Sequence, residues 1–247
     1  SGNIGLGHRR LSIIDLSRAA DQPMSNHSSE IQIVFNGEIY NHNDVRNELE
    51  LLKKYEWKTD HSDTEVIIHA YEEWGIECIH KFRGMFAFAL WDARIRKLWL
   101  VRDRIGIKPL YYIRDNDKLI FASEIKALLK DPQQSREVNE EGVFHYLSFL
   151  TVPAPATLFK GIFKMPPATW MCIDDQGNVE ENKYWDCLDN HQISTQTEDE
   201  IARNILKEVK TAVSLRKVSD VPVGVFLSGG IDSSTNAALF SDSNGQN

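Results

Sequence analysis

A glycine–serine string near the end of the chain has the residue types of an anion-binding loop. The string Ser228-Gly-Gly-Ile-Asp-Ser-Ser234 follows the apolar run Val221–Leu227 and precedes a presumed helix over Thr235–Phe240. Gly229 and Gly230 let backbone N–H groups approach a ligand, and the following helix directs its positive end to the same place. No Gly-Lys-Ser/Thr follows at the spacing of a Walker loop. The string indicates a phosphate site, against the simpler interpretation of a tight turn that needs glycine only for packing.

Further strings with chemically useful side chains occur earlier in the chain. They are Gly7-His-Arg-Arg-Leu-Ser-Ile-Ile-Asp15, Asn36-Gly-Glu-Ile-Tyr-Asn41, Ser62-Asp-Thr-Glu65, Arg83-Gly-Met-Phe-Ala-Phe-Ala-Leu-Trp-Asp92, Arg102–Tyr112 and Phe121–Leu128. In this order they resemble the glutaminase domain of class II glutamine amidotransferases, which are N-terminal-nucleophile enzymes. The glycine–serine string resembles the pyrophosphate loop of ATP pyrophosphatases. The succession of the two is similar to the glutamine-hydrolysing asparagine synthetase family, and the likeness covers nearly the whole chain.

The resemblance implies a binding site for free glutamine. Such a site needs a cation for the α-carboxylate, anions for the α-ammonium, and donors for the oxyanion that forms on the amide. The family match places Arg10 at the carboxylate, Glu38 and Asp63 at the ammonium, and the Asn36 side chain and Gly37 N–H in the oxyanion hole. Together the expected glutamine-binding residues are Arg10, Leu11, Ile13, Asn36, Gly37, Glu38 and Asp63.

Each of these residues also has a simpler structural interpretation. Arg10 could be a surface arginine beside Arg9, and Asp63 could be an acid in the first turn of a helix, where it stabilises by up to ~1 kcal/mol. Asn36-Gly37 could be an ordinary two-residue turn. Seen in isolation, Asp63 favours the structural interpretation, and the family resemblance is what assigns it to the ligand.

At the other end of the chain the resemblance implies ATP, with Mg²⁺ as its companion. The residues expected around ATP and its pyrophosphate are Leu227, Ser228, Gly229, Gly230, Asp232 and Ser233. The eight histidines show no ligand spacing with acidic or thiol partners, so we expect no protein metal site.

The nucleophile of the family is a cysteine at residue one of the mature chain, and this sequence has none before Cys78. Ser1 lies only seven residues before His8, which is too close to take that place, so we expect the sequence to be a fragment that does not hydrolyse glutamine. A dyad of Cys78 and His80 is an alternative. Residues two apart on a helix face different directions, so a buried structural thiol is favoured.

For the intact protein the resemblance implies an asparagine synthase (glutamine-hydrolysing), an ATP-dependent carbon–nitrogen ligase of amino-acid biosynthesis. Ammonia released from glutamine would capture aspartate activated as an acyl-adenylate. Two alternatives stay open: an amidotransferase of the same architecture acting on a sugar acid or another carboxylate, or forming a lactam, and a non-catalytic glutamine-binding or assembly module. The expected partners are small molecules, a homodimer is compatible with the sequence, and neither nucleic acid nor membrane is expected.

The elements that position these residues follow from periodicity. Glu30–Phe35 alternates as a strand that runs into Asn36-Gly37 as a turn pair. Two pairs of short apolar runs predict antiparallel hairpins. Their strands are expected at Met85–Trp91 with Leu98–Arg102, and at Leu110–Ile113 with Leu119–Ala122; a further strand is expected at Thr169–Ile173. The stripe Phe86, Phe88 and Leu90 with Trp91 and Trp99 is interpreted as core.

Two helices are expected between the first strand and the hairpins. One covers Asp44–Lys54, with Asn43 as its cap and Val45, Leu49 and Leu52 as its apolar stripe. The other begins at Ser62–Glu65 and ends at Gly75. Strands joined by short turns with helices packed on them indicate an α+β domain, and the resemblance specifies an αββα sandwich.

The last quarter of the chain has a different pattern. Asp186–Glu200 reads as a linker, and an amphipathic helix follows over 201–215. The apolar run Val221–Leu227 predicts a strand of a buried parallel sheet, so we expect the beginning of a Rossmann-like domain. The domains expected are 1–186 for the glutaminase and 187–247 for the linker and the start of the synthetase part.

Composition limits the remaining classes. The chain has 247 residues, 42% of them hydrophobic, and its net charge of −8 comes from 28 basic and 36 acidic residues without a basic cluster. This argues against nucleic acid as the main partner. The chain has no apolar run of eighteen residues, so no transmembrane helix is expected, and it has no signal-peptide pattern. Its three cysteines are too few for a disulfide scaffold. We therefore expect a cytoplasmic protein.

Overall fold

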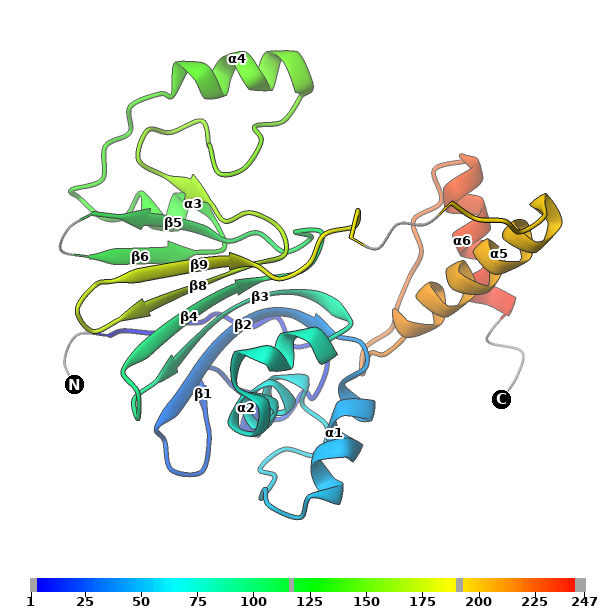
Figure 1. Cartoon of the computed structure of the whole chain (residues 1–247), viewed down its shortest axis with the longest axis horizontal. Coiled ribbons are helices and arrows are strands. Elements are labelled where there is room, and N and C mark those ends of the chain that lie inside the picture. The colour runs from blue at the N-terminus through cyan, green and yellow to red at the C-terminus, as the bar shows by residue number, and fades with distance from the viewer. Residues whose placement is uncertain (1–3, 116–117, 190–192, 243–247) are drawn as a thin grey trace.

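The computed structural model describes residues 4–115, 118–189 and 193–242, and most of the chain forms a layered domain (Figure 1). Its layers are a pair of helices, a large antiparallel sheet, a small antiparallel sheet and a short helix. The expected αββα architecture is thus present.

The large sheet contains six strands in the order β1-β2-β3-β4-β8-β9, and every neighbouring pair is antiparallel. The strands are β1 (Met24–Ser25), β2 (Ile31–Ile39), β3 (Gly84–Asp92), β4 (Lys97–Arg102), β8 (Thr169–Asp174) and β9 (Val179–Lys183).

Two helices cover one face of this sheet. They are α1 (His42–Leu51) and α2 (Asp63–Trp74), and the 3-10 segment η2 (Gly75–Lys81) follows α2 directly; another 3-10 turn, η1, covers Arg18–Ala20. Alternate residues of β2 and β3, such as Ile33 and Phe88, are buried against the helices. This hydrophobic cluster supplies most of the driving force for docking the helices, at ~25 cal/mol per Å² of buried apolar surface.

The opposite face of the large sheet packs on the small sheet, whose order is β6-β5-β7. Its strands are β5 (Tyr111–Arg114), β6 (Leu119–Ala122) and β7 (Phe163–Lys164). Small and medium side chains such as Ala87, Ala89 and Met171 fill the space between the sheets. The short helix α3 (Ile125–Leu128) closes the far side of the small sheet through Leu128.

The remaining helices project from the layers (Figure 1). They are α4 (Glu140–Phe149), α5 (Glu198–Leu215) and α6 (Ile231–Asp242). Within the described ranges, no helix is both long enough and apolar enough to cross a membrane.

Most of the predicted elements are present, with shifted ends. α2 begins after Ser62 and ends at Gly75 as expected, and both hairpins form. α1 begins at His42, so the expected cap Asn43 lies inside the helix; Asn41 takes the cap position and bonds to the 81–83 backbone instead. Leu52 lies after the helix and is 39% exposed, so it is not part of the buried stripe.

In the expected core stripe, Phe86, Phe88, Leu90 and Trp99 lie on the helix-covered face of the large sheet. Trp91 faces the small sheet instead.

The prediction of a turn at Asn36-Gly37 is wrong. Both residues lie inside β2 and pair with Ala87 and Phe86 of β3. A Cβ on Gly37 would stand 2.1 Å from the Met85 carbonyl oxygen. Glycine is therefore required at this position because the two strands approach closely, and not because the chain turns here.

The prediction of a strand over Val221–Leu227 is also wrong, because this segment has no regular structure and is largely exposed. A parallel strand needs neighbours for its hydrogen bonds, and the described residues supply none. α6 begins at Ile231, directly after Gly230, four residues earlier than expected. The predicted linker is shorter, because Thr197 caps α5 with a capping box and the helix begins at Glu198.

Candidate functional site

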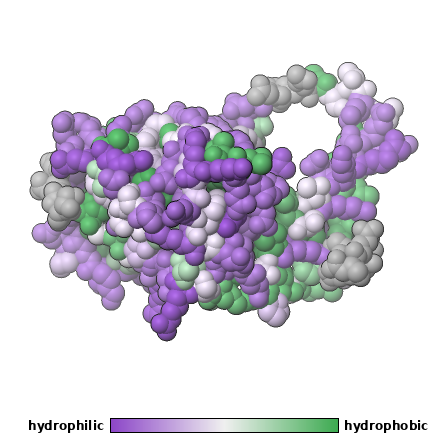
Figure 2. Space-filling model, turned by 90° about the horizontal axis from the view of Figure 1, so that it is seen from below, coloured by the Kyte–Doolittle hydropathy of each residue, from purple (hydrophilic) through white to green (hydrophobic). Residues whose placement is uncertain are grey.

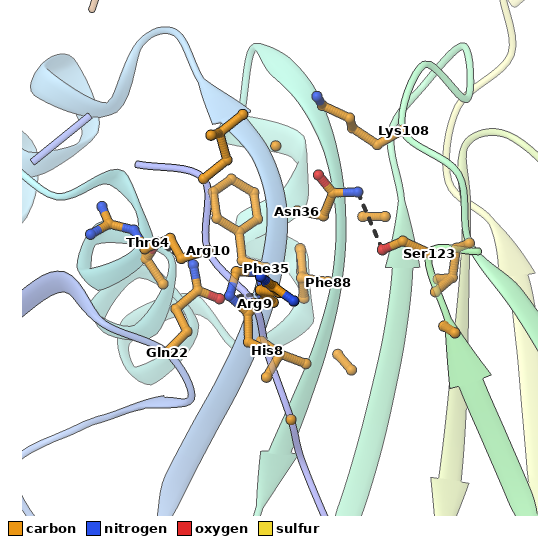
Figure 3. Close-up of a pocket in the computed structure, with 18 of the residues that line it drawn as sticks. His8, Arg9, Arg10, Gln22, Phe35, Asn36, Thr64, Phe88, Lys108 and Ser123 are labelled. Carbon is orange, nitrogen blue, oxygen red and sulfur yellow. Dashed lines mark hydrogen bonds between the residues drawn. The ribbon is translucent and has the colours of Figure 1, made fainter. Parts of the chain in front are cut away.

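A cavity of about 630 Å³ lies beside the middle of β2 and β3, between the two sheets (Figure 3). It is bounded by residues 7–14, by the start of α2, by Lys108 and by the turn after β6. All seven residues predicted to bind glutamine line this one cavity: Arg10, Leu11, Ile13, Asn36, Gly37, Glu38 and Asp63.

Arg10 is held in place by the loop that follows it. Its Nη2 donates to the carbonyl oxygens of Ile14 and Asp15, both at 2.6 Å, and its Nη1 lies 3.5 Å from the Ser17 carbonyl oxygen. Nη2 is thus fully used by the protein. The Nε–H has no partner among the described residues, so a ligand carboxylate would be bound through the remaining donors.

The central residues of β2 present polar groups to the cavity. The Asn36 Nδ2 donates to Ser123 Oγ at 3.2 Å, across the gap between the two sheets (Figure 3). Gly37 follows in the same strand and brings its backbone to the cavity wall. An amide and a backbone N–H side by side can stabilise a developing oxyanion.

Asp63 and Glu38 are acidic residues of the cavity lining, as is Glu124. Asp63 is 5% exposed, and its Oδ2 accepts a hydrogen bond from the Ile39 N–H at 3.1 Å. Burial raises the pKa of Asp63 to about 7; the backbone hydrogen bonds and the Arg10 charge oppose this rise, and Glu38 adds to it. Burial also raises the pKa of Glu38, partly offset by Lys108. The raised pKa values mean that burial destabilises the charged form of both carboxyls. A cationic group in the cavity would stabilise that charged form.

Sequence reasoning did not single out four other residues that line the cavity: His8, Gln22, Lys108 and Ser123. The Nδ1 of His8 is buried without a hydrogen-bond partner among the described residues. Gln22 accepts from the Phe35 N–H at 2.6 Å and donates to Thr64 Oγ1 at 3.3 Å. His8, Lys108 and Ser123 belong to strings used for the family resemblance, but their roles depend on contacts distant in sequence.

The chain's thiols lie away from the cavity. Cys78 and Cys172 are buried in the core under the helices, and Cys187 is exposed. Burial raises the pKa of Cys78, and the His80 ring contacts Glu77 and Tyr184 instead of the thiol. The structure therefore supports a structural thiol over the Cys78–His80 dyad, while Ser1 lies outside the described residues.

The residues predicted to bind ATP lie together between the irregular segment and α6. Ser228 Oγ and Ser233 Oγ are 2.9 Å apart, and Ser233 also donates to the Gly230 carbonyl oxygen at 3.0 Å. Gly229 has φ +86, and no atom lies within 4 Å of the place where its Cβ would stand. Asp232 lies in the first turn of α6. An open glycine loop at the start of a helix fits a phosphate group.

Within the described ranges, no three His, Cys, Asp or Glu side chains lie together as a group that could hold a metal ion.

Several known proteins are similar to most of this chain. Asparagine synthetase [glutamine-hydrolyzing] 1 of Bacillus subtilis is 41% identical over 94% of this chain and 36% of its own length. Amidase chyE of Penicillium rubens is 37% identical over 97% of this chain and 35% of its own length. The chain thus spans about a third of these relatives. A solved glutamine phosphoribosylpyrophosphate amidotransferase from B. subtilis has a TM-score of 0.44 and 17% identity, covering 90% of this chain and 47% of that one.

Two family models match this chain, one over the residues predicted to bind glutamine and the other over those predicted to bind ATP. The asparagine synthase family matches residues 204–246, where the glycine–serine loop lies. The glutamine amidotransferase domain family matches residues 1–185, which hold the two sheets and the whole cavity. The chain therefore belongs to the glutamine amidotransferase domain family and continues into the start of an asparagine synthase region.

Proposed function

We propose that this chain binds free L-glutamine in the cavity beside β2, as part of a glutamine-dependent amidotransferase of the asparagine synthetase type. The observation that carries the proposal is the convergence of Arg10, Asp63, Glu38 and Asn36 on one cavity. A small zwitterion needs opposite charges within its own length, and Arg10 is near enough for its charge to lower the pKa of Asp63.

In this proposal each group meets a defined part of glutamine. The free donors of Arg10 bind the α-carboxylate, and the carboxylates of Asp63 and Glu38 bind the α-ammonium. The Asn36 amide and the Gly37 N–H then face the side-chain amide, where they would stabilise an oxyanion. One such donor lowers the barrier by ~3 kcal/mol.

For the second half of the reaction we propose that Leu227, Ser228, Gly229, Gly230, Asp232 and Ser233 hold ATP. When bound, ATP supplies the phosphoanhydride that activates a carboxylate, most simply that of aspartate, for attack by ammonia. The open backbone at Gly229 and the first turn of α6 would receive its phosphates, and Asp232 would hold Mg²⁺ or orient the loop. The carboxylate that accepts the ammonia can differ from aspartate, since a relative that is 37% identical over 97% of this chain is named an amidase.

Calorimetric titration with L-glutamine tests the proposal. Arg10→Lys should weaken binding about tenfold or more, because a lysine cannot both donate to the carbonyl oxygens of the 14–15 loop and bind the ligand carboxylate. The analogue 4-carbamoylbutanoate, which lacks the α-amine, should bind weakly to the wild-type chain for want of a partner for Asp63.

Arg203→Lys, an exposed arginine of α5, is the matched control and should bind like the wild type. Equal affinity of the Arg10 variant and the wild type for L-glutamine would refute the proposed role of Arg10.

A further inference from the structure

The segment that leads into the glycine–serine loop makes polar contacts with the rim of the glutamine cavity. The contact is centred on Asp220, which lies eight residues before Ser228 and about two hundred residues after the loop it meets. Its backbone N–H donates to the Ile13 carbonyl oxygen at 2.9 Å. Its Oδ2 accepts from the Asp15 N–H at 2.7 Å and lies 2.5 Å from His61 Nε2.

The loop contacted by Asp220 is the same loop that holds Arg10. The Asp15 N–H binds the Asp220 carboxylate, while the Asp15 carbonyl oxygen accepts from Arg10 Nη2. Ile13, whose carbonyl receives the Asp220 N–H, itself lines the cavity. One peptide segment therefore connects Asp220 to the guanidinium proposed to bind the α-carboxylate.

The same loop needs an external support. Asp15 has φ +54, a backbone conformation that is uncommon for residues other than glycine, and it is 3% exposed. Within the loop, its own Oδ1 accepts from the Ser17 N–H at 3.0 Å. The contacts from Asp220 supply partners for the Ile13 carbonyl and the Asp15 N–H, which the loop itself leaves open.

A second contact lies nearby. The Arg216 guanidinium stands 5.0 Å from the centre of the Tyr40 ring. Tyr40 directly follows Ile39, whose N–H donates to Asp63 Oδ2. Residues 216–220 thus contact the loop that holds Arg10 and also Tyr40, the neighbour of the Ile39 that binds Asp63.

We propose that Asp220 is a positioning residue for the glutamine cavity, acting through the Ile13–Asp15 backbone to fix Arg10. This inference rests on the proposed function. It makes the shape of the cavity depend on the segment that carries the glycine–serine loop. By thermodynamic reciprocity, glutamine binding then stabilises the contacts of Asp220 to the same extent.

The test compares Asp220→Ala and Asp220→Asn with the control Asp199→Ala, which removes an exposed acid of α5. In each variant of the chain, the affinity for L-glutamine and the amide hydrogen exchange of residues 10–17 are measured. Asp220→Ala should weaken glutamine binding about tenfold, the effect of one lost positioning hydrogen bond, and should speed exchange in 10–17. Asp220→Asn retains an acceptor for the Asp15 N–H and should have a smaller effect.

A double-mutant cycle separates positioning from general destabilisation. If Asp220 acts through Arg10, Asp220→Ala should add little to the loss already caused by Arg10→Lys, whereas independent effects would multiply. Unchanged exchange in 10–17, unchanged glutamine affinity, or multiplying losses would each overturn the inference. If the wild-type chain binds no glutamine, the proposed function fails. Faster exchange of residues 10–17 in Asp220→Ala would then still support the positioning of this loop by Asp220, and unchanged exchange would overturn it.

Discussion

At the scale of single residues, the proposed glutamine site depends on the protonation of Asp63. Its carboxyl is buried beside Ile39 and faces Glu38, and burial raises its pKa to about 7. Below that pH the group is neutral in the empty cavity, and a neutral carboxyl cannot pair with an ammonium ion. Binding of the α-ammonium must then release the proton, which costs affinity.

We therefore expect glutamine affinity to fall as the pH falls through about 7, and to be about tenfold weaker at pH 6 than at pH 8. Asp63→Asn should bind weakly, with little pH dependence over that range. Titration calorimetry at several pH values checks this. Asp44→Asn, an exposed acid of α1, should keep the wild-type profile; a wild-type affinity that is flat between pH 6 and 8 would contradict the role of Asp63.

At the scale of elements, β2 shapes the cavity through its contact with β3. Gly37 has no space for a side chain, because the Met85 carbonyl oxygen and Phe86 Cα lie 2.1 and 2.7 Å from the place where its Cβ would stand. On β3, Gly84 pairs with Ile39 and is similarly constrained, because a Cβ there would stand 2.2 Å from the Glu38 carbonyl oxygen. The pair lets the two strands meet where Asn36 and Glu38 must face the cavity.

Gly37→Ala should destabilise the fold by about 3 kcal/mol, because the added methyl group forces the two strands apart. Urea unfolding measures this loss. Gly7→Ala, at a position with no atom within 4 Å of the new Cβ, should change stability by less than about 0.5 kcal/mol. A similar small loss for both variants would show that β2 and β3 can separate without cost.

The same strand shows where sequence reasoning ends. Periodicity and end signals were enough for α2, since Ser62 and Gly75 bound a clear helical pattern. They were misleading at Asn36-Gly37, because a local turn signal cannot reveal that a distant strand will approach the glycine. His8 and Lys108 were missed for the same reason: their places at the cavity are set by contacts remote in sequence.

At the scale of the whole molecule, burial is distributed unevenly. α2 is buried along most of its length, whereas α5 has no buried residue. Ile205 and Leu206 of α5 are 59% and 47% exposed. Figure 2 shows hydrophobic surface gathered toward the side of the molecule that carries α5 and α6.

We expect the amides of α5 to exchange with solvent at least about a hundredfold faster than those of α2, because local unfolding of α5 exposes little additional apolar surface. Hydrogen exchange followed by mass spectrometry of the chain compares the two helices in one sample. Equal protection of α5 and α2 would show that α5 is stabilised by packing that the structure does not contain.

The contact between Asp220 and Asp15 also has a consequence for the order in which the protein is made. The loop that carries Arg10 is synthesised before Asp220, which contacts it and lies 205 positions after Asp15. At 5–20 residues per second this separation takes roughly 10–40 s. The last strand of the sandwich, β9, ends at Lys183, so the sandwich can fold only in the final part of that interval, while the rim beside Arg10 still lacks Asp220. If Asp220 positions Arg10 as proposed, the cavity reaches its final shape only after translation has passed into the region that carries the glycine–serine loop.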